Sequence, residues 1–265
     1  MPYSTVIYEV KNGIALITLN RPEAMNAMNQ EMSGEIVSAC RRVEADETIG
    51  VVIFKGAGDK AFSSGMDLKE RAAGAPVPPI VRRQAKTAPE ANTPTKAVAA
   101  ISKPTIAAIN GYAVGGGLEL ALACDLRIAA ADAKLGLAEV RRGIIPGAGG
   151  TQRLARVVGL ARALELGLSG RLVEGAEAFR ICLVHQVVAR EELLTAAERL
   201  AETLLKGAPL SLRFIKEAIR KGSELPLEEG LRLEADLSAL IATTEDAKEG
   251  PRAFAEKREP VWKGK

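Results

Sequence analysis

The chain has 265 residues, of which 47% are hydrophobic and 26% charged, and its formal net charge is +3. A chain of this length buries roughly 70–75% of its unfolded surface, so folding requires neither a disulfide nor a metal. Aromatic residues make up only 3% of the chain, which speaks against base stacking on RNA and against an aromatic platform for sugars.

The sequence contains no pattern typical of a membrane or targeting segment. No run reaches the ~18 consecutive apolar residues of a membrane span. The N-terminal segment lacks the charge and apolar pattern of a signal or transit peptide. We therefore expect a cytoplasmic protein with an ordinary globular composition and no membrane partner.

The N-terminal part predicts a layered α/β core. Residues 6–10 and Ile14–Leu19 predict two strands on either side of Asn12-Gly13, a dipeptide preferred in tight hairpin turns. Residues 29–46 have apolar side chains at helical spacing and predict an amphipathic helix, and residues 51–54 predict a buried strand. This order of strand, helix and strand favours right-handed winding.

Residues 105–153 contain the most informative pattern. Thr105–Ile109 predicts a buried strand, the turn signal Asn110-Gly111 ends it, and three consecutive glycines at 115–117 precede a helix over residues 118–123. Glycines between a strand and a helix let backbone N–H groups approach a ligand at a helix N-terminus, where negative charge is favoured. Glu119 follows these glycines inside an apolar run, and a buried carboxylate is costly unless it has partners or a function.

A second acidic residue, Glu139, follows two further predicted strands at residues 125–130 and 134–137. From these residues alone a structural interpretation stays open. Glu119 could be an acid in the first turn of a helix, and Glu139 a surface residue beside Arg141 and Arg142.

The rest of the chain is mostly helical in pattern. Residues 72–94 are rich in proline, which excludes a continuous helix over the first half of this segment. Helices are predicted at 151–158, with Thr151 as the cap, and at 161–168, followed by a helical turn at Gly175–Arg180. From Glu191 onward the helical pattern is expected to break only at three prolines, which are Pro209, Pro226 and Pro251.

The cysteines and the histidine do not predict a metal site or a nucleophile. The three cysteines lack metal-ligand spacing, and Cys40 and Cys124 are expected to be thiols of the core. The only histidine, His185, lies in a predicted strand and is assigned a structural role.

Several of these segments resemble the enoyl-CoA hydratase/isomerase (crotonase) family. The resemblance rests on GYAVGGGLELALACD and GLAEVRRGIIPGAGGTQRL and extends to NRPEAMNAM, KAFSSGMDLKER and AFAEKREPVWKG. It covers nearly the whole chain and is weakest between Ala72 and Lys103. It implies an α/β fold, a crotonase-like spiral of ββα units over residues 1–190. A C-terminal helical region, residues 191–265, would then form homotrimers or hexamers built as dimers of trimers.

Within this family the chain is most similar to the enoyl-CoA hydratase branch, methylglutaconyl-CoA hydratase included. The resemblance implies addition of water to an α,β-unsaturated acyl-CoA thioester, without a metal or another cofactor. By position, Glu119 would activate the water and Glu139 would give a proton to Cα. The backbone N–H groups of Ser64 and Gly116 would form the oxyanion hole that binds the thioester oxygen.

The resemblance also implies a set of substrate-binding residues. They are Ser64, Gly65, Met66, Asp67, Gly116, Phe254 and Lys257. Phe254 and Lys257 are predicted on one helix face, where they would approach the CoA nucleotide of a neighbouring subunit. The chain departs from the family pattern at Cys182, where relatives usually have glycine. It also departs in the proline-rich segment, which leaves the acyl group open.

Four alternatives remain at this point. The first is an enoyl-CoA isomerase of the same fold, which needs only one acid/base. The second is an RNA-binding crotonase homologue, but the expected helix at 29–46 contains no lysine and only Arg41 and Arg42 as cations, so we expect no nucleic-acid partner. The third is a glycosidase with paired carboxylates, and the fourth is a non-catalytic scaffold.

Overall fold

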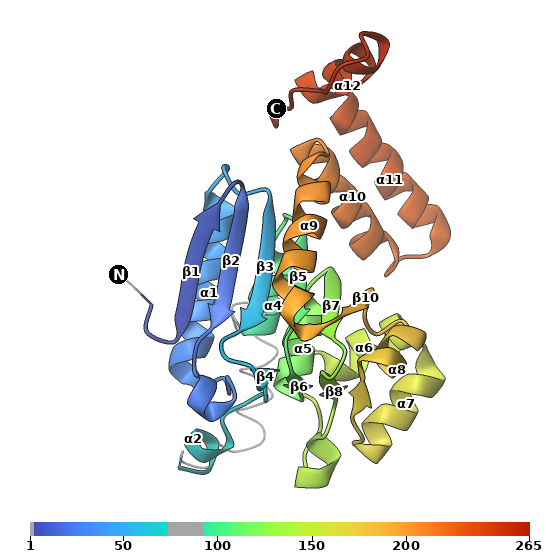
Figure 1. The fold of residues 1–265 in the computed structure, drawn as a ribbon. Coiled ribbons are helices and arrows are strands. Elements are labelled where there is room, and N and C mark those ends of the chain that lie inside the picture. Colours follow the sequence, from blue (N-terminus) through green and yellow to red (C-terminus); the bar gives the residue numbers. More distant parts are fainter. Residues whose placement is uncertain (1–2, 74–92) are drawn as a thin grey trace.

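The computed structural model describes residues 3–73 and 93–265 (Figure 1). The first half of the proline-rich segment, including Pro76, Pro78 and Pro79, and the cations Arg82, Arg83 and Lys86 lie outside the described residues.

The first sheet has six strands in the order β1-β2-β3-β5-β7-β10. Their bounds are β1 (Val6–Lys11), β2 (Ile14–Leu19), β3 (Val51–Gly56), β5 (Thr105–Ile109), β7 (Leu126–Ala130) and β10 (Gln186–Val188). β1 and β2 are antiparallel, and the other neighbours are parallel. At the turn between β1 and β2, Asn12 and Gly13 both have positive φ, 51° and 77°. The predicted hairpin is confirmed.

The second sheet is formed by short strands in the order β4-β6-β8-β9. Their bounds are β4 (Ala61–Ser63), β6 (Tyr112–Val114), β8 (Lys134–Gly136) and β9 (Val173–Glu174). β4, β6 and β8 run parallel and directly follow β3, β5 and β7 along the chain. Each turn of the chain thus places one strand in each sheet before a helix returns it, which is the expected spiral of ββα units.

Helices cover both faces of the first sheet (Figure 1). On one face lie α1 (Gln30–Ala45), α4 (Pro94–Ala100) and α5 (Gly116–Ala123). The Asn29 side chain accepts the Met32 N–H and so caps α1. The apolar side chains at helical spacing in α1 are buried in the main core: Met32, Ile36, Ala39, Cys40 and Val43.

α9 (Leu193–Leu205) covers the opposite face of the first sheet. Leu193, Ala197 and Ala201 pack there against Val51 and Ile106. α9 lies beyond residue 190, the expected end of the core, and yet completes the core. The division into residues 1–190 and 191–265 stays a prediction. α9 lies on the C-terminal side of that boundary but packs against the first sheet.

Shorter helices and turns surround the second sheet. Their bounds are η1 (Pro22–Ala24), α2 (Leu68–Ala73), η2 (Glu139–Arg142), α6 (Gly150–Val158), α7 (Leu160–Ser169), α8 (Gly175–Arg180) and η3 (Arg190–Glu192). The prediction that Thr151 caps its helix is wrong. α6 begins at Gly150, and Gly149 stands at the cap position with φ 105°, so Thr151 is already inside the first turn.

The last three helices are α10 (Pro209–Gly222), α11 (Leu227–Ala242) and α12 (Glu245–Ala255). α10 contacts the core through Lys216 and Arg220, and α11 and α12 project away from the sheets (Figure 1). Pro209 and Pro226 stand at helix starts as expected. Pro251 lies inside α12 and does not end it, because a proline removes one i→i−4 hydrogen bond and the following turn can still form. No helix in residues 3–73 or 93–265 is both long enough and apolar enough to span a membrane.

Candidate active site

The N-terminus of α5 is where the three glycines meet the second sheet. Gly115 has φ 55° and ψ −123°, a backbone conformation that residues other than glycine rarely adopt. A Cβ on Gly117 would collide with the Ser63 carbonyl of β4. These two glycines allow α5 to start directly against the end of β4, which places backbone N–H groups at the junction of β4, β6 and α5.

Glu119 lies in the first turn of α5 and is 3% exposed. Its Oε1 accepts two backbone hydrogen bonds, from Ala148 N–H at 2.7 Å and from Gly150 N–H at 2.8 Å. Hydrogen bonds from backbone amides to a carboxylate are charge-assisted and therefore strong. The expected burial of Glu119 is confirmed, and the loop before α6 holds the carboxylate in place.

Glu139 opens η2 and is 8% exposed, so it is not a surface residue. Its Oε2 is buried and has no hydrogen-bond partner among the described residues. Burial raises the pKa of this carboxyl, and the charge of Glu119 raises it further. A carboxyl that keeps its proton to higher pH is suited to act as a general acid.

The two glutamates flank the same turn of the chain. A Cβ placed on Gly115 would lie 3.0 Å from Glu139 Oε1, and the Glu119 N–H donates to the Gly115 carbonyl. The structure therefore brings both predicted carboxylates to the start of α5. They differ in surroundings: one oxygen of Glu119 has two amide donors, whereas one oxygen of Glu139 is without a partner in the described part of the chain.

The predicted oxyanion donor Ser64 needs correction. Its N–H already donates to the Met25 carbonyl at 3.0 Å, so it is directed toward η1 and away from the glutamates. The next residue, Gly65, has φ 95°, a backbone conformation that favours glycine. The amide nitrogen of Met66 instead lies 3.4 Å from the position that a Cβ would take on Gly116. At this site the backbone amide of Met66, and not that of Ser64, therefore lies beside Gly116.

The side chain of Asp67 has a structural role. It forms an ion pair with Arg21 at 2.9 Å and accepts the N–H groups of Lys69 and Glu70 at the start of α2. The hydrogen bond from Arg21 lowers the pKa of Asp67. The Asp67 N–H donates to Met28, and the Met28 N–H donates to the Gly65 carbonyl at 2.7 Å. The loop from Ser64 to Asp67 is therefore held by the segment that contains Arg21 and Met28.

Residues 20–28 are the part of the site that sequence reasoning did not assign. Asn26 is fully buried and donates to the carbonyls of Ala57 and Ala61. Met25 and Asn26 both have φ 53°. Their signal in the sequence is the segment NRPEAMNAM, which contributed to the resemblance but received no role there.

With this geometry established, comparison with known proteins decides the family. The model of the family described as enoyl-CoA hydratase/isomerase matches residues 9–265. The chain belongs to the enoyl-CoA hydratase/isomerase family. The resemblance and the fold expected from the sequence are both confirmed.

Individual relatives cover the whole chain. It is 43% identical to a probable enoyl-CoA hydratase of Mycobacterium bovis over 99% of either chain. It is 42% identical to (E)-benzylidenesuccinyl-CoA hydratase of Thauera aromatica over 98% of this chain and 99% of the relative. The crystal structure of enoyl-CoA hydratase from Bacillus anthracis is 38% identical, with a TM-score of 0.91 and coverage of 99% and 100%. These relatives are similar along their entire length.

Two site residues expected from the hydratase/isomerase pattern lie elsewhere in the chain. Phe254 is 87% exposed on α12, at the far end of the molecule from α2 and β4 (Figure 1). Lys257 does not share a helix face with it, because α12 ends at Ala255 and Lys257 has φ 52°. Neither residue meets Glu119 or Glu139 within one chain.

The cysteines and the histidine have structural roles and lie outside the candidate active site. Burial raises the pKa of Cys40 and that of Cys124 to about 12, which keeps both thiols protonated and unreactive. His185 lies just before β10, accepts the Arg127 N–H through Nδ1 and has a pKa lowered by burial. Cys182 is exposed with φ 62°, the conformation that suits the glycine expected there. Among the described residues no His, Cys, Asp and Glu side chains group as a metal site would require.

Proposed function

We propose that this protein is an enoyl-CoA hydratase, which reversibly adds water across the 2,3-double bond of an α,β-unsaturated acyl-CoA thioester. The observation that carries this proposal is a pair of buried carboxylates, Glu119 and Glu139, beside backbone amides at the start of α5. The hydratase names of the relatives support the same reaction. The reaction requires no metal and no redox cofactor.

The thioester oxygen gains negative charge as water adds, and this charge needs fixed hydrogen-bond donors. We assign these donors to the backbone N–H groups of Gly116 and Met66. Gly116 is the first residue of α5, where backbone N–H groups point out of the helix and favour negative charge. Met66 is assigned because its amide nitrogen lies beside Gly116. Ser64 is not assigned, because its N–H donates to the Met25 carbonyl.

The two carboxylates take different roles because their surroundings differ. Glu119 is held by two amide donors and acts as the base that activates water for attack on Cβ. Glu139, whose pKa is raised by burial, carries the proton that is delivered to Cα. Both lie near the same turn at Gly115, and we propose that they share one water.

An isomerase of the same family is the rival, and one assay separates the two. The purified protein should hydrate crotonyl-CoA, followed by loss of the absorbance of the conjugated thioester, and should shift the double bond of a 3-enoyl-CoA far more slowly. A panel of straight, branched and cyclic enoyl-CoA thioesters then ranks the acyl groups. Rapid isomerisation with negligible hydration of every panel member would overturn the proposal.

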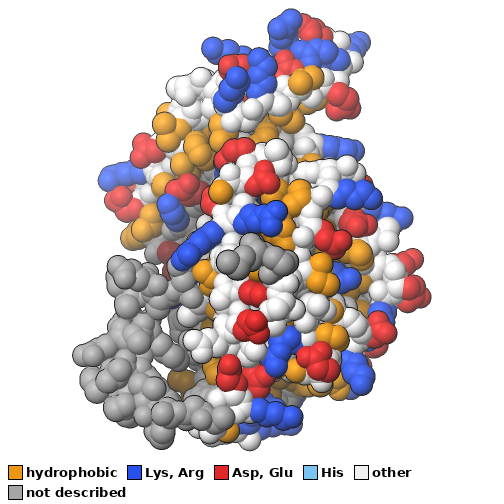
Figure 2. All heavy atoms as spheres, turned by 90° about the vertical axis from the view of Figure 1, so that its left-hand side faces the viewer, with side chains coloured by type: hydrophobic (Ala, Val, Ile, Leu, Met, Phe, Trp, Pro, Cys, Tyr) orange, Lys and Arg blue, Asp and Glu red, His pale blue; other side chains and the backbone are white. Residues whose placement is uncertain are grey.

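We further propose that the protein works as a homotrimer or as a hexamer made of two trimers. Figure 2 shows hydrophobic side chains exposed below the charged top of the molecule, where α12 lies. The C-terminal helices carry large exposed hydrophobic side chains: Ile215, Ile219, Leu227, Leu231, Leu240 and Phe254. Exposed apolar surface of this kind is typical of protein–protein interfaces. In such an assembly Phe254 and Lys257 would reach the CoA nucleotide of a neighbouring subunit.

Light scattering tests this assembly, since it separates a monomer from a trimer or hexamer. Substitution of Leu227 and Leu231 by Glu should reduce the assembly to smaller species. Lys257→Ala should raise the KM for the CoA thioester. We propose acyl-CoA as the ligand and no nucleic acid, and a monomeric species that binds RNA at physiological salt would contradict both statements.

A further inference from the structure

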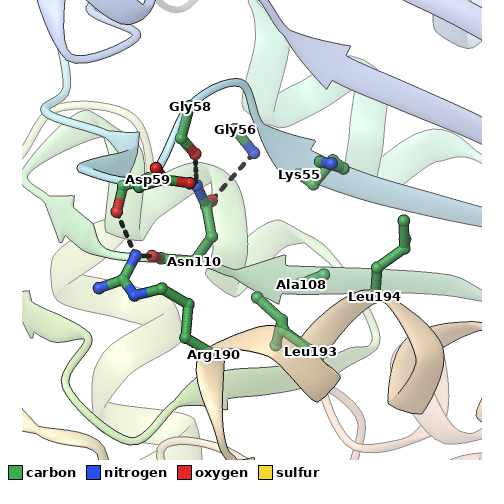
Figure 3. A pocket seen from close by; sticks show the side chains of 9 residues that line it. All are labelled: Lys55, Gly56, Gly58, Asp59, Ala108, Asn110, Arg190, Leu193 and Leu194. Atoms are coloured by element: carbon green, nitrogen blue, oxygen red, sulfur yellow. Dashed lines mark hydrogen bonds between the residues drawn. The ribbon is translucent and has the colours of Figure 1, made fainter.

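Arg190 joins three places where the chain passes from the first sheet to the second. Its guanidinium donates to the carbonyl of Asp59 between β3 and β4 and to the carbonyl of Asn110 between β5 and β6. It also pairs with the Asp132 carboxylate between β7 and β8 at 2.5 Å. Figure 3 shows Arg190 reaching from the start of α9 to Asp59 and Asn110.

The three corners are already joined in pairs by the backbone. The Tyr112 N–H donates to the Lys60 carbonyl at 3.0 Å, and the Lys134 N–H donates to the Gly111 carbonyl at 3.3 Å. The Asn110 side chain adds bonds to Gly58 and Gly56 (Figure 3). Arg190 is a single side chain that contacts all three corners, and its planar group with several fixed donors suits this geometry.

Each corner leads through a very short strand to one group of the proposed site. β4, β6 and β8 have three residues each. Met66 follows β4, Gly116 follows β6, and Glu139 follows β8. Short strands paired in one sheet are stiff, so a displacement at their starts is carried to their ends. The mutual distances of the three corners therefore affect those of the two amides and the carboxyl.

We propose that Arg190 is a positioning residue for the hydration site, which it adjusts by fixing the starts of β4, β6 and β8 relative to one another. This inference rests on the proposed hydratase function. Arg190 contacts neither glutamate, and it belongs to η3, directly before the helix that covers the other face of the first sheet. A residue at the junction between the core and the C-terminal region thus sets the geometry of the site.

The surroundings of Arg190 allow its replacement without collapse of the fold. A cavity of about 130 Å³ adjoins it, lined in part by Lys55, Ala108 and Leu193. Such a volume is large enough for water, which can satisfy the carbonyls that lose the guanidinium. Arg190 is 33% and Asp132 64% exposed, so the ion pair itself contributes little to stability.

The test compares kcat and KM for crotonyl-CoA in four variants of the full-length enzyme. Arg190→Met, which keeps the length of the side chain but removes its donors, should lower kcat ~10-fold with KM within ~2-fold, because small misplacement of reacting groups mainly affects kcat. Arg190→Lys should restore part of the loss, since an ammonium still pairs with Asp132. Asp132→Asn, which keeps both carbonyl contacts, should lose less than Arg190→Met.

Arg213→Met is the matched control. Arg213 of α10 pairs with Glu47 of the core at 2.7 Å. Glu47 follows the end of α1, so this ion pair lies away from the three corners. This substitution should leave kcat unchanged. Circular dichroism and gel filtration verify folding and assembly in each variant.

The outcomes separate this inference from the proposed function. A wild-type enzyme that fails to hydrate every enoyl-CoA tested contradicts the function itself. An active wild type with unchanged kcat in folded Arg190→Met, or with an equal loss in Arg213→Met, overturns the positioning role. If Arg190→Met does not fold, wild-type kcat in both Arg190→Lys and Asp132→Asn overturns it as well.

Discussion

The carboxylates at the two ends of α5 differ in how fully they are hydrogen-bonded. Just past its C-terminus, Asp125 accepts hydrogen bonds from the Thr105 N–H and hydroxyl, and pairs with Lys216 at 2.7 Å and Arg220 at 2.8 Å. At its N-terminus, Glu139 has a buried oxygen without a partner in the described residues, and Gly116 presents the first N–H of the helix.

This difference separates a structural from a functional use of charge. At the C-terminal end the carboxylate is saturated, and α10 docks there through Lys216 and Arg220. A largely buried network in which every charge has a partner stabilises one arrangement. At the N-terminal end unsatisfied groups cost stability, which is acceptable where a substrate and a water supply the missing partners. Loss of charge at one end should therefore reduce rate, and at the other end stability.

The largest effect is expected at the glutamates. Glu119→Gln and Glu139→Gln should each lower kcat for crotonyl-CoA hydration by ~10²–10⁴, the usual contribution of a general acid or base. KM should change little, because neither carboxylate binds the CoA part. Steady-state kinetics at constant pH measure both values. A glutamine variant with near wild-type kcat would remove that residue from the mechanism.

The backbone donor at the same end of α5 should show a comparable loss. Gly116→Pro removes the N–H at the first helical position, where proline is tolerated, and loss of one oxyanion donor costs ~10²–10³ in kcat. Gly116→Ala is the matched control, because it adds a Cβ, 3.3 Å from Met28, but keeps the N–H. Equal losses in the two variants would mean that crowding, and not the donor, is responsible.

At the opposite end of α5, Asp125→Asn should affect stability and not rate. Breaking a largely buried ion pair costs about 3 kcal/mol, and each kcal/mol lowers Tm by roughly 2–4 °C in a chain of this size. Differential scanning calorimetry gives the shift, and kcat of the folded variant should remain close to that of the wild type. A large loss of kcat without loss of stability would show that the two ends are not separable.

The smallest effect concerns the pH dependence of stability. The pKa of Glu139 is raised in the folded protein by burial, so its contribution to stability is fully present below the unfolded pKa of about 4.3 and is lost as pH rises through the folded value. Glu139→Gln should therefore be more stable than the wild type at neutral pH. The gain should vanish below about pH 4. Denaturant unfolding across this range measures it, and a glutamine variant less stable at pH 7 would contradict the assignment.

The sequence predicted those parts of the molecule that depend on local pattern. Thr105–Ile109 was predicted to the residue, since it is a mostly apolar run bounded by clear breaks. The burial of Glu119 followed from its leucine and alanine neighbours. The choice between Ser64 and Met66 depends instead on the φ of Gly65 and on a hydrogen bond from Ser64 to Met25, and both are tertiary properties.

Other features were also beyond local pattern. The end of α12 before Lys257 and the continuation of the helix through Pro251 depend on how the last helices fold. Arg190 has no sequence signal, because its three acceptors lie far from it along the chain and come together only in the spiral. Long-range contacts of this kind determine which of several plausible residues serves the site.

The central claim is that Glu119 and Glu139 act as one unit on a single water. A double-mutant cycle tests it most directly, with crotonyl-CoA hydration measured for the wild type, both single glutamine variants and the double variant. If the pair acts together, the double variant should be only slightly slower than the slower single variant, far from the product of the two losses. Fully multiplicative losses, or one silent glutamate together with rapid 3-enoyl-CoA isomerisation, would contradict the account.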